Sequence, residues 1–83
     1  MIQRAHTDLK NRLEIESEQV RLINAERGSW PDTSLGCPKK GEEYVEFPSR
    51  GLQIEFAAQG QTYLYRSDME RLVFCGQQIK PVR

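Results

Sequence analysis

Residues 52–65 read LQIEFAAQGQTYLY, and this stretch decides the fold. In its first half, apolar and polar residues alternate, which is typical of a strand with one buried face. The pair Gln59-Gly60 interrupts this pattern, and the residues that follow it, Thr62-Tyr63-Leu64-Tyr65, favour a second strand. We therefore predict a β-hairpin that turns at Gln59-Gly60.

The N-terminal segment predicts a helix from about Ile2 to Glu14. Its apolar residues recur at steps of three and four and form one stripe, which consists of Ile2, Ala5, Leu9 and Leu13. Asp8 and Arg12 stand four residues apart between these positions, where a salt bridge supports a helix. The stripe indicates that this helix packs on a sheet.

Three further segments show strand features. Residues 20–26 are rich in apolar and β-branched residues and predict a first strand, which Gly28 ends. Residues 43–47 alternate apolar with charged side chains and predict a short edge strand before Pro48. Residues 72–75 are continuously apolar, as in a central strand. The fold class is therefore α+β, with one N-terminal helix packed on a small, mainly antiparallel sheet of three to five strands and a long loop.

The composition is that of one small domain. The chain has 83 residues, of which 37% are hydrophobic, and this is enough for one layer of helix on sheet but not for two cores. We expect a single domain over residues 1–83, with a core from about 2 to 75 and a polar tail over 76–83.

The charge balance bears on the partner. Twelve basic and twelve acidic side chains cancel, so we expect no nucleic-acid partner. No stretch approaches the roughly 18 apolar residues that cross a bilayer, so we expect no membrane insertion. The N-terminus shows no apolar export segment. The expected location is cytoplasmic if the chain is full length and extracytoplasmic if an export signal was removed.

The sequence predicts a loop of defined conformation over residues 30–38, which read Trp-Pro-Asp-Thr-Ser-Leu-Gly-Cys-Pro. Two prolines exclude a regular helix or a central strand, because each removes a backbone donor and restricts the residue before it. Together with residues 39–41 the segment makes a connection longer than about 12 residues, and loops of that length have a function or are disordered.

With these residues placed, the chain resembles a family of small, largely uncharacterised bacterial domains, sometimes attached to export signals or lipoprotein leaders. The resemblance covers about residues 5–75. It rests on Ala5, Asp8, Leu9, Arg12 and Leu13, on the loop from Trp30 to Pro38, on Gly51 and Ile54, on Gly60, Tyr63 and Tyr65, and on Cys75. Many relatives carry His where this chain has Arg66. The resemblance implies no reaction.

Cys37 and Cys75 allow one disulfide or none. A bridge would tie the loop to the last strand and contribute about 4 kcal/mol in the chain-entropy model. Two reduced thiols would leave Cys37 exposed and Cys75 packed as a small hydrophobe. The only histidine, His6, is far away in sequence and is expected to be solvated on the helix. We therefore expect no catalytic residue, no metal site and no cofactor.

The candidate binding residues are Trp30, Asp32, Ser34, Tyr44, Tyr63 and Tyr65. Trp30 is either an anchor for a partner or a cap on the core, with its indole N–H bonded to a carbonyl. Asp32 and Ser34 are most often used for local turns. Tyr63 and Tyr65 point to one face of their strand and form either an exposed aromatic patch beside Arg66 or part of the core.

These observations predict a binding protein rather than an enzyme. The first hypothesis is a small module that docks an unknown protein or peptide through the loop of residues 30–44 or through a sheet edge, with a protease-inhibitor-like domain as one form of it. The alternatives are a structural accessory subunit of a larger assembly and a thiol-dependent redox protein that uses Cys37. The oligomeric state is left open.

Overall fold

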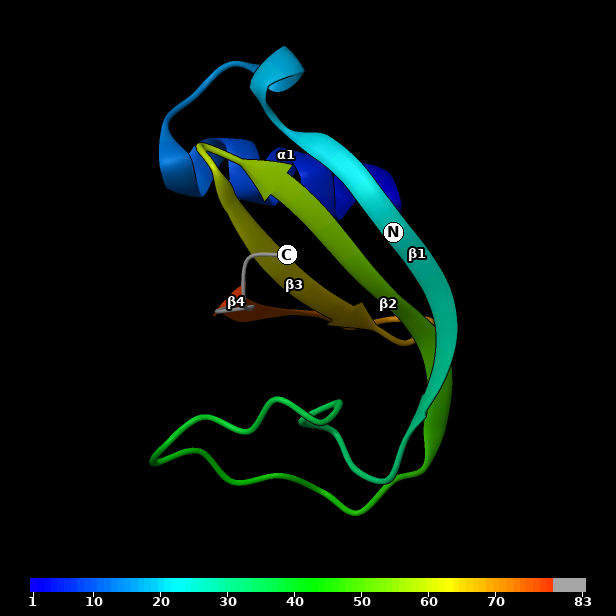
Figure 1. Cartoon of the computed structure of the whole chain (residues 1–83). Coiled ribbons are helices and arrows are strands. Elements are labelled where there is room, and N and C mark those ends of the chain that lie inside the picture. Colours follow the sequence, from blue (N-terminus) through cyan, green and yellow to red (C-terminus); the bar gives the residue numbers. More distant parts are fainter. Residues whose placement is uncertain (79–83) are drawn as a thin grey trace.

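The computed structural model describes residues 1–78 (Figure 1). A helix and a short 3₁₀ helix come first, and four strands follow. In chain order the elements are α1 (Ile2–Leu13), η1 (Ser17–Gln19), β1 (Arg21–Trp30), β2 (Ser49–Ala58), β3 (Gln61–Ser67) and β4 (Leu72–Gln78). Residues 79–83, the second part of the predicted polar tail, lie outside the described residues.

The strands form one antiparallel sheet in the order β1-β2-β3-β4, and α1 crosses behind β2 and β3 in Figure 1. The predicted hairpin is β2–β3, and it turns at Gln59 and Gly60 with φ angles of 53° and 75°. Two successive positive φ values match the twist of the flanking strands. The predicted α+β class is confirmed.

The core lies between α1 and one face of the sheet. Ala5 and Leu9 of the predicted stripe are fully buried there. Ile54 pairs with Tyr65 across the hairpin, and Phe56 pairs with Tyr63, so these side chains share that face. The rings of Phe56 and Tyr65 meet edge to face with centroids 6.0 Å apart. Apolar periodicity therefore accounts for the residues that form this core.

A carboxylate of α1 ties the helix to β3. Asp8 accepts a hydrogen bond from the Tyr65 hydroxyl at 2.6 Å, and Arg12 Nε donates to the same oxygen at 2.6 Å. Partial burial alone would raise the pKa of Asp8, but these two hydrogen bonds outweigh it and lower the pKa from 3.8. Burial and the bond to Asp8 raise the pKa of the Tyr65 phenol well above its ordinary value.

His6 is not the solvated residue that the sequence predicts. Its ring is half-buried and packs edge to face on Phe56, with centroids 5.7 Å apart. Its Nε2 lies 3.0 Å from the carbonyl oxygen of Val20. His6 therefore helps to fix the segment between α1 and β1.

β1 is longer than predicted, since it runs through Gly28 to Trp30. The glycine does not end the strand, because it pairs with Gly51 of β2 in the ladder. A Cβ at Gly28 would lie 2.6 Å from Cη2 of Trp30, so the missing side chain makes room for the indole ring. Gly28, which in the sequence suggests the end of a strand, is instead needed for the packing of Trp30.

The predicted edge strand at residues 43–47 is wrong. This segment belongs to a loop over residues 31–48, and β2 begins after Pro48. Alternation alone does not make a strand, since a strand also needs a neighbour for its backbone groups. Within the described part of the chain, only Val45 finds such a backbone partner here, because the Thr33 N–H donates to its carbonyl oxygen at 3.0 Å.

β4 is an edge strand rather than the central strand that its apolar run predicts. It also continues through Gln78, so residues 76–78 of the expected tail are part of the sheet. Phe74 accounts for the apolar character, because it packs on Tyr65 at a centroid distance of 5.1 Å and lies under the Arg12 guanidinium. The apolar residues of β4 are thus covered by neighbouring side chains rather than by a second flanking strand.

Candidate functional site

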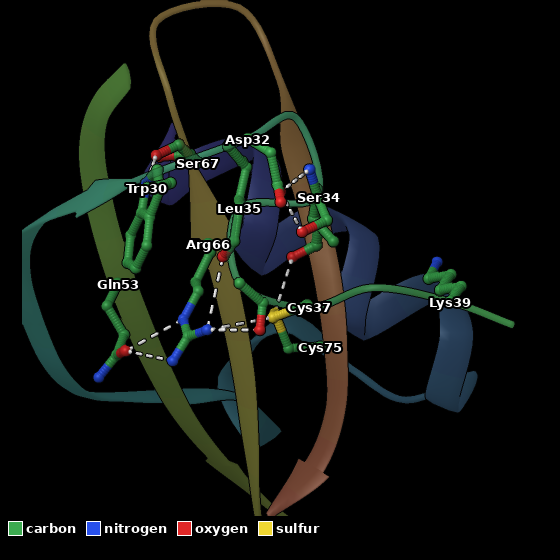
Figure 2. The surroundings of a disulfide bond; sticks show 12 residues. Trp30, Asp32, Ser34, Leu35, Cys37, Lys39, Gln53, Arg66, Ser67 and Cys75 are labelled. Atoms are coloured by element: carbon green, nitrogen blue, oxygen red, sulfur yellow. Dashed lines mark hydrogen bonds between the residues drawn. A yellow bond between two sulfur atoms is a disulfide. The ribbon is translucent and has the colours of Figure 1, made fainter. Parts of the chain in front are cut away.

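The loop of residues 31–48 is joined to β4 by the Cys37–Cys75 disulfide (Figure 2). The two Cα atoms are 5.5 Å apart, which is usual for a bridged pair. Cys75 is the extra residue of a β-bulge, because Leu64 pairs with Gly76 and Tyr65 with Phe74. A bulge re-aims a side chain, and here it directs Cys75 to the loop. The bridge alternative is confirmed, and it uses both cysteines of the chain.

Trp30 packs at the point where β1 enters the loop. Its side chain is buried, and its indole N–H donates to the Ser67 carbonyl oxygen at 3.1 Å. The structure therefore places Trp30 as a cap under the loop, the second of the two roles considered from the sequence. This position holds the start of the loop against the end of β3.

Asp32 and Ser34 build a local turn. One oxygen of the Asp32 carboxylate accepts hydrogen bonds from the backbone N–H of Ser34, at 2.9 Å, and from the Ser34 hydroxyl. The Leu35 and Cys37 N–H groups donate to the carbonyl oxygens of Asp32 and Ser34. This is the local use of an Asp and a Ser that gives a loop internal backbone partners.

Arg66 is the anchor that the sequence reasoning did not identify. It extends from the face of β3 opposite Tyr65, and Figure 2 shows its guanidinium between the loop and Gln53. Nη1 donates to the Gly36 carbonyl oxygen at 2.9 Å, whereas Nε and Nη2 donate to Gln53 Oε1 at 3.1 and 3.0 Å. The guanidinium also stacks over Trp30, 4.9 Å from the ring centroid. One side chain thus contacts the loop, β2 and the tryptophan.

Gly36 is required where Arg66 meets the loop. Its φ is +78°, a conformation that L side chains rarely adopt, and a Cβ there would lie 2.4 Å from Arg66 Nη1. The signals that could have found this site were a glycine beside a loop cysteine and a lone arginine on a strand. Neither is specific without the fold.

The second half of the loop is held to the first by backbone and side-chain bonds. Val45 N–H donates to Thr33 Oγ1 at 3.0 Å, and the Tyr44 hydroxyl accepts from the Lys39 N–H at 2.9 Å and donates to Glu42. The Lys39 bond lowers the pKa of Tyr44, but desolvation and the Glu42 carboxylate outweigh it, so the net shift is upward. Tyr44 therefore shapes the loop.

Two apolar side chains of this second half stay exposed. Val45 is 67% exposed and Phe47 is 55% exposed, although both lie in a loop fixed at several points. In Figure 1 the loop projects from the end of β1 and β2, at the opposite end of the sheet from α1. Val45 and Phe47 therefore form an exposed apolar surface on an ordered loop.

The structure brings only part of the predicted site together. Trp30, Asp32 and Ser34 gather around the loop start, and Tyr44 lies farther along the same loop. Tyr63 and Tyr65 are buried under α1, so the aromatic patch considered beside Arg66 does not form. Arg66 and the tyrosines lie on opposite faces of β3.

Within residues 1–78 no cluster of three or more metal-binding side chains occurs. Over the same residues, no helix combines the length and the apolar character needed to cross a bilayer.

Comparison with known proteins places the chain in a family. No curated protein and no solved structure gives a significant match. A family model described as a domain of unknown function, DUF8738, matches residues 2–75, a range that begins with α1 and ends at the second cysteine of the bridge. The chain therefore belongs to the DUF8738 family of domains of unknown function.

Proposed function

We propose that this domain is a non-catalytic module that binds a protein or peptide through the loop of residues 31–48. The observation that carries the proposal is the combination of a fixed loop with exposed apolar side chains. The first half of the loop is held by the disulfide, Trp30 and Arg66. The second half presents Val45 and Phe47 to solvent.

A loop held in this way suits binding for an energetic reason. Ordering a flexible loop costs free energy on association, and a loop that is already ordered avoids that cost. The three anchors fix the first half of the loop, and the two hydrogen bonds between Thr33 and Val45 hold the second half against the first. Apolar side chains at the contact can then contribute to affinity without a large ordering cost.

The test is affinity capture from the protein's own cells, with quantification of the captured proteins by mass spectrometry. The informative variant is Val45→Ser with Phe47→Ser, because both side chains are exposed and the backbone bonds of the loop remain. The matched control is Glu43→Gln, an exposed residue of the same loop. An unchanged thermal midpoint in each variant shows that the fold is intact.

We expect at least one protein to be captured by the wild type and by Glu43→Gln and to fall about tenfold with the double variant, as for the loss of an apolar hot spot. Recovery of the same proteins in equal amounts by all three would contradict a role of this loop in binding.

A further inference from the structure

The face of the sheet that carries α1 continues beyond the helix, at the end where the loop begins (Figure 1). In the β1–β2 ladder, Arg27 lies opposite Leu52, and Ser29 lies opposite Arg50. Side chains along a strand point alternately to the two faces of the sheet, and these four residues lie on the same face as Ile54. Both arginine side chains are exposed there.

A groove of about 480 Å³ occupies this part of the face. Leu52 and Met69 supply its apolar wall, and Gly28 and Gly51 expose backbone. The rest of the lining consists of Arg27, Ser29 and Arg50. Met69 is 91% exposed, although it is a large apolar residue. A groove with an apolar wall and a backbone floor fits an extended chain better than a compact small molecule.

The charge of this groove is positive. Arg27 and Arg50 stand on neighbouring strands, and neither makes an ion pair within the described residues. No carboxylate lines the groove over the same part of the chain. Two like charges without a counter-charge favour an anionic group between them.

A second groove, of about 460 Å³, shares Arg50 and Met69 with the first. Phe47 and Pro48 of the loop line it, so it continues the exposed apolar surface of the loop. Of its acidic residues, Glu70 is exposed. Both grooves therefore have apolar walls, but within residues 1–78 the first is lined by arginines without carboxylates, whereas in the second Asp68 and Glu70 accompany the arginines.

Asp68, the other acidic residue of the second groove, is already used. It accepts hydrogen bonds from the backbone N–H groups of Glu70 and Arg71, at 2.8 and 2.6 Å, and from the Arg71 guanidinium at 3.0 Å. Burial alone would raise the pKa of Asp68, but these bonds lower it from 3.8. The turn that presents Met69 is thereby braced.

We propose that the two grooves beside Met69 bind an extended peptide segment of the partner, with a carboxylate against Arg27 and Arg50 and an apolar side chain between Phe47 and Met69. This inference rests on the proposed function and gives the partner a chemistry. A nucleic acid is a poorer occupant, because the first groove offers only these two cations and phosphate backbones are usually held by many.

The test is selection from a phage library of random peptides of about ten residues, a length typical of extended segments that occupy such grooves. The oxidised wild-type domain is the bait, and the enriched peptides are synthesised and titrated against the soluble protein. The test variants are Arg27→Gln with Arg50→Gln, and Met69→Ser. The control is Arg21→Gln, an exposed arginine near the other end of β1. A short single-stranded DNA serves as an anionic competitor.

We expect enriched peptides to carry Asp or Glu within about three residues of Leu, Phe or Met. Their affinity should fall about tenfold with the double arginine variant, and to a smaller extent with Met69→Ser, while Arg21→Gln leaves it unchanged. Enriched peptides without acidic residues, full affinity for the double variant, equal competition by the DNA, or no enrichment at all would each overturn the proposal.

The outcomes also separate this inference from the proposed function. Peptides that bind the double arginine variant normally but lose affinity with Val45→Ser would move the site to the loop, and the proposed function would stand. The proposed function fails only if affinity capture is also insensitive to the change at Val45 and Phe47.

Discussion

The two faces of the sheet are covered by different means. Under α1, apolar side chains such as Leu9, Phe56 and Tyr65 exclude water. On the opposite face, the loop of residues 31–48 is held by a disulfide, a tryptophan and the donors of Arg66. The helix-covered face depends on the amount of apolar area buried, whereas the loop-covered face adds a few directed contacts to its smaller buried group, which includes Leu35 and Leu64.

The difference follows from where backbone groups find partners. A helix satisfies most of its own N–H and C=O groups, so an apolar stripe is enough to dock it. A loop has no such ladder, and the carbonyl groups that its own turns leave unpaired need donors from elsewhere. Arg66 supplies them to Gly36 and, at 3.4 Å, to Leu35. A loop held by a few specific contacts can lose its order when one of these contacts is removed.

The largest effect is expected on the helix-covered face. Phe56→Ala leaves a cavity beneath α1 and should lower the free energy of unfolding by about 4 kcal/mol, as large-to-small changes in a core do. Urea denaturation followed by circular dichroism measures it. A loss below about 1 kcal/mol would show that apolar burial does not hold this face.

Loss of the bridge should be the next largest effect. Cys37→Ser with Cys75→Ser is expected to lower the free energy of unfolding by about 3 kcal/mol, below the limit of about 4 kcal/mol in the chain-entropy model, because the unfolded chain regains the freedom of a closed loop and measured losses often fall short of that limit. The same denaturation experiment, with and without reductant on the wild type, checks it. An unmoved midpoint in both cases would deny the bridge a structural role.

Gly36 offers a sharper test of the Arg66 contact. Gly36→Ala is expected to cost about 2 kcal/mol, because the positive φ disfavours alanine and its methyl group displaces the guanidinium. Gly41→Ala is the matched control, since its φ of +87° imposes similar strain but its Cβ would meet nothing within 4 Å. Equal losses for the two variants would mean that the contact with Arg66 adds nothing.

The smallest effect concerns Asp8, whose pKa is lowered in the folded state. A lowered pKa gives stability that is present above the ordinary pKa of 3.8 and is lost as the pH falls through the folded value. Asp8 is partly exposed, so Asp8→Asn should cost less than about 1 kcal/mol at neutral pH. Thermal midpoints of both proteins across acid pH should converge as the pH falls. Divergence on acidification would reverse the assigned sign.

The helix-covered face could be predicted from the sequence. The stripe of α1 and the alternation in residues 52–65 are periodic signals, and both led to the observed elements. The strand predictions failed for two segments in which the apolar pattern has another cause. Residues 43–47 alternate without a strand partner, and the apolar run of β4 is covered by side chains rather than by a further strand.

The loop-covered face could be predicted only in part. The disulfide was one of two alternatives, since two cysteines do not reveal their distance. The role of Arg66 could not be foreseen, because its contacts join β3 to two distant parts of the chain, the start of the loop at Trp30 and Gly36 and β2 at Gln53. The burial of Tyr63 and Tyr65 was likewise open, because alternation fixes which residues share a face but not which face the helix covers.

The central claim is that the loop is ordered by its anchors independently of the helix-covered core, and amide hydrogen exchange tests it most directly. The informative amides are those of Thr33, Leu35 and Cys37, compared with the amides of the β2–β3 hairpin. We predict that the oxidised wild type protects both groups, and that the double cysteine variant loses protection in the loop while the hairpin keeps it. Unprotected loop amides in the wild type, or loss of both groups together in the variant, would contradict the account.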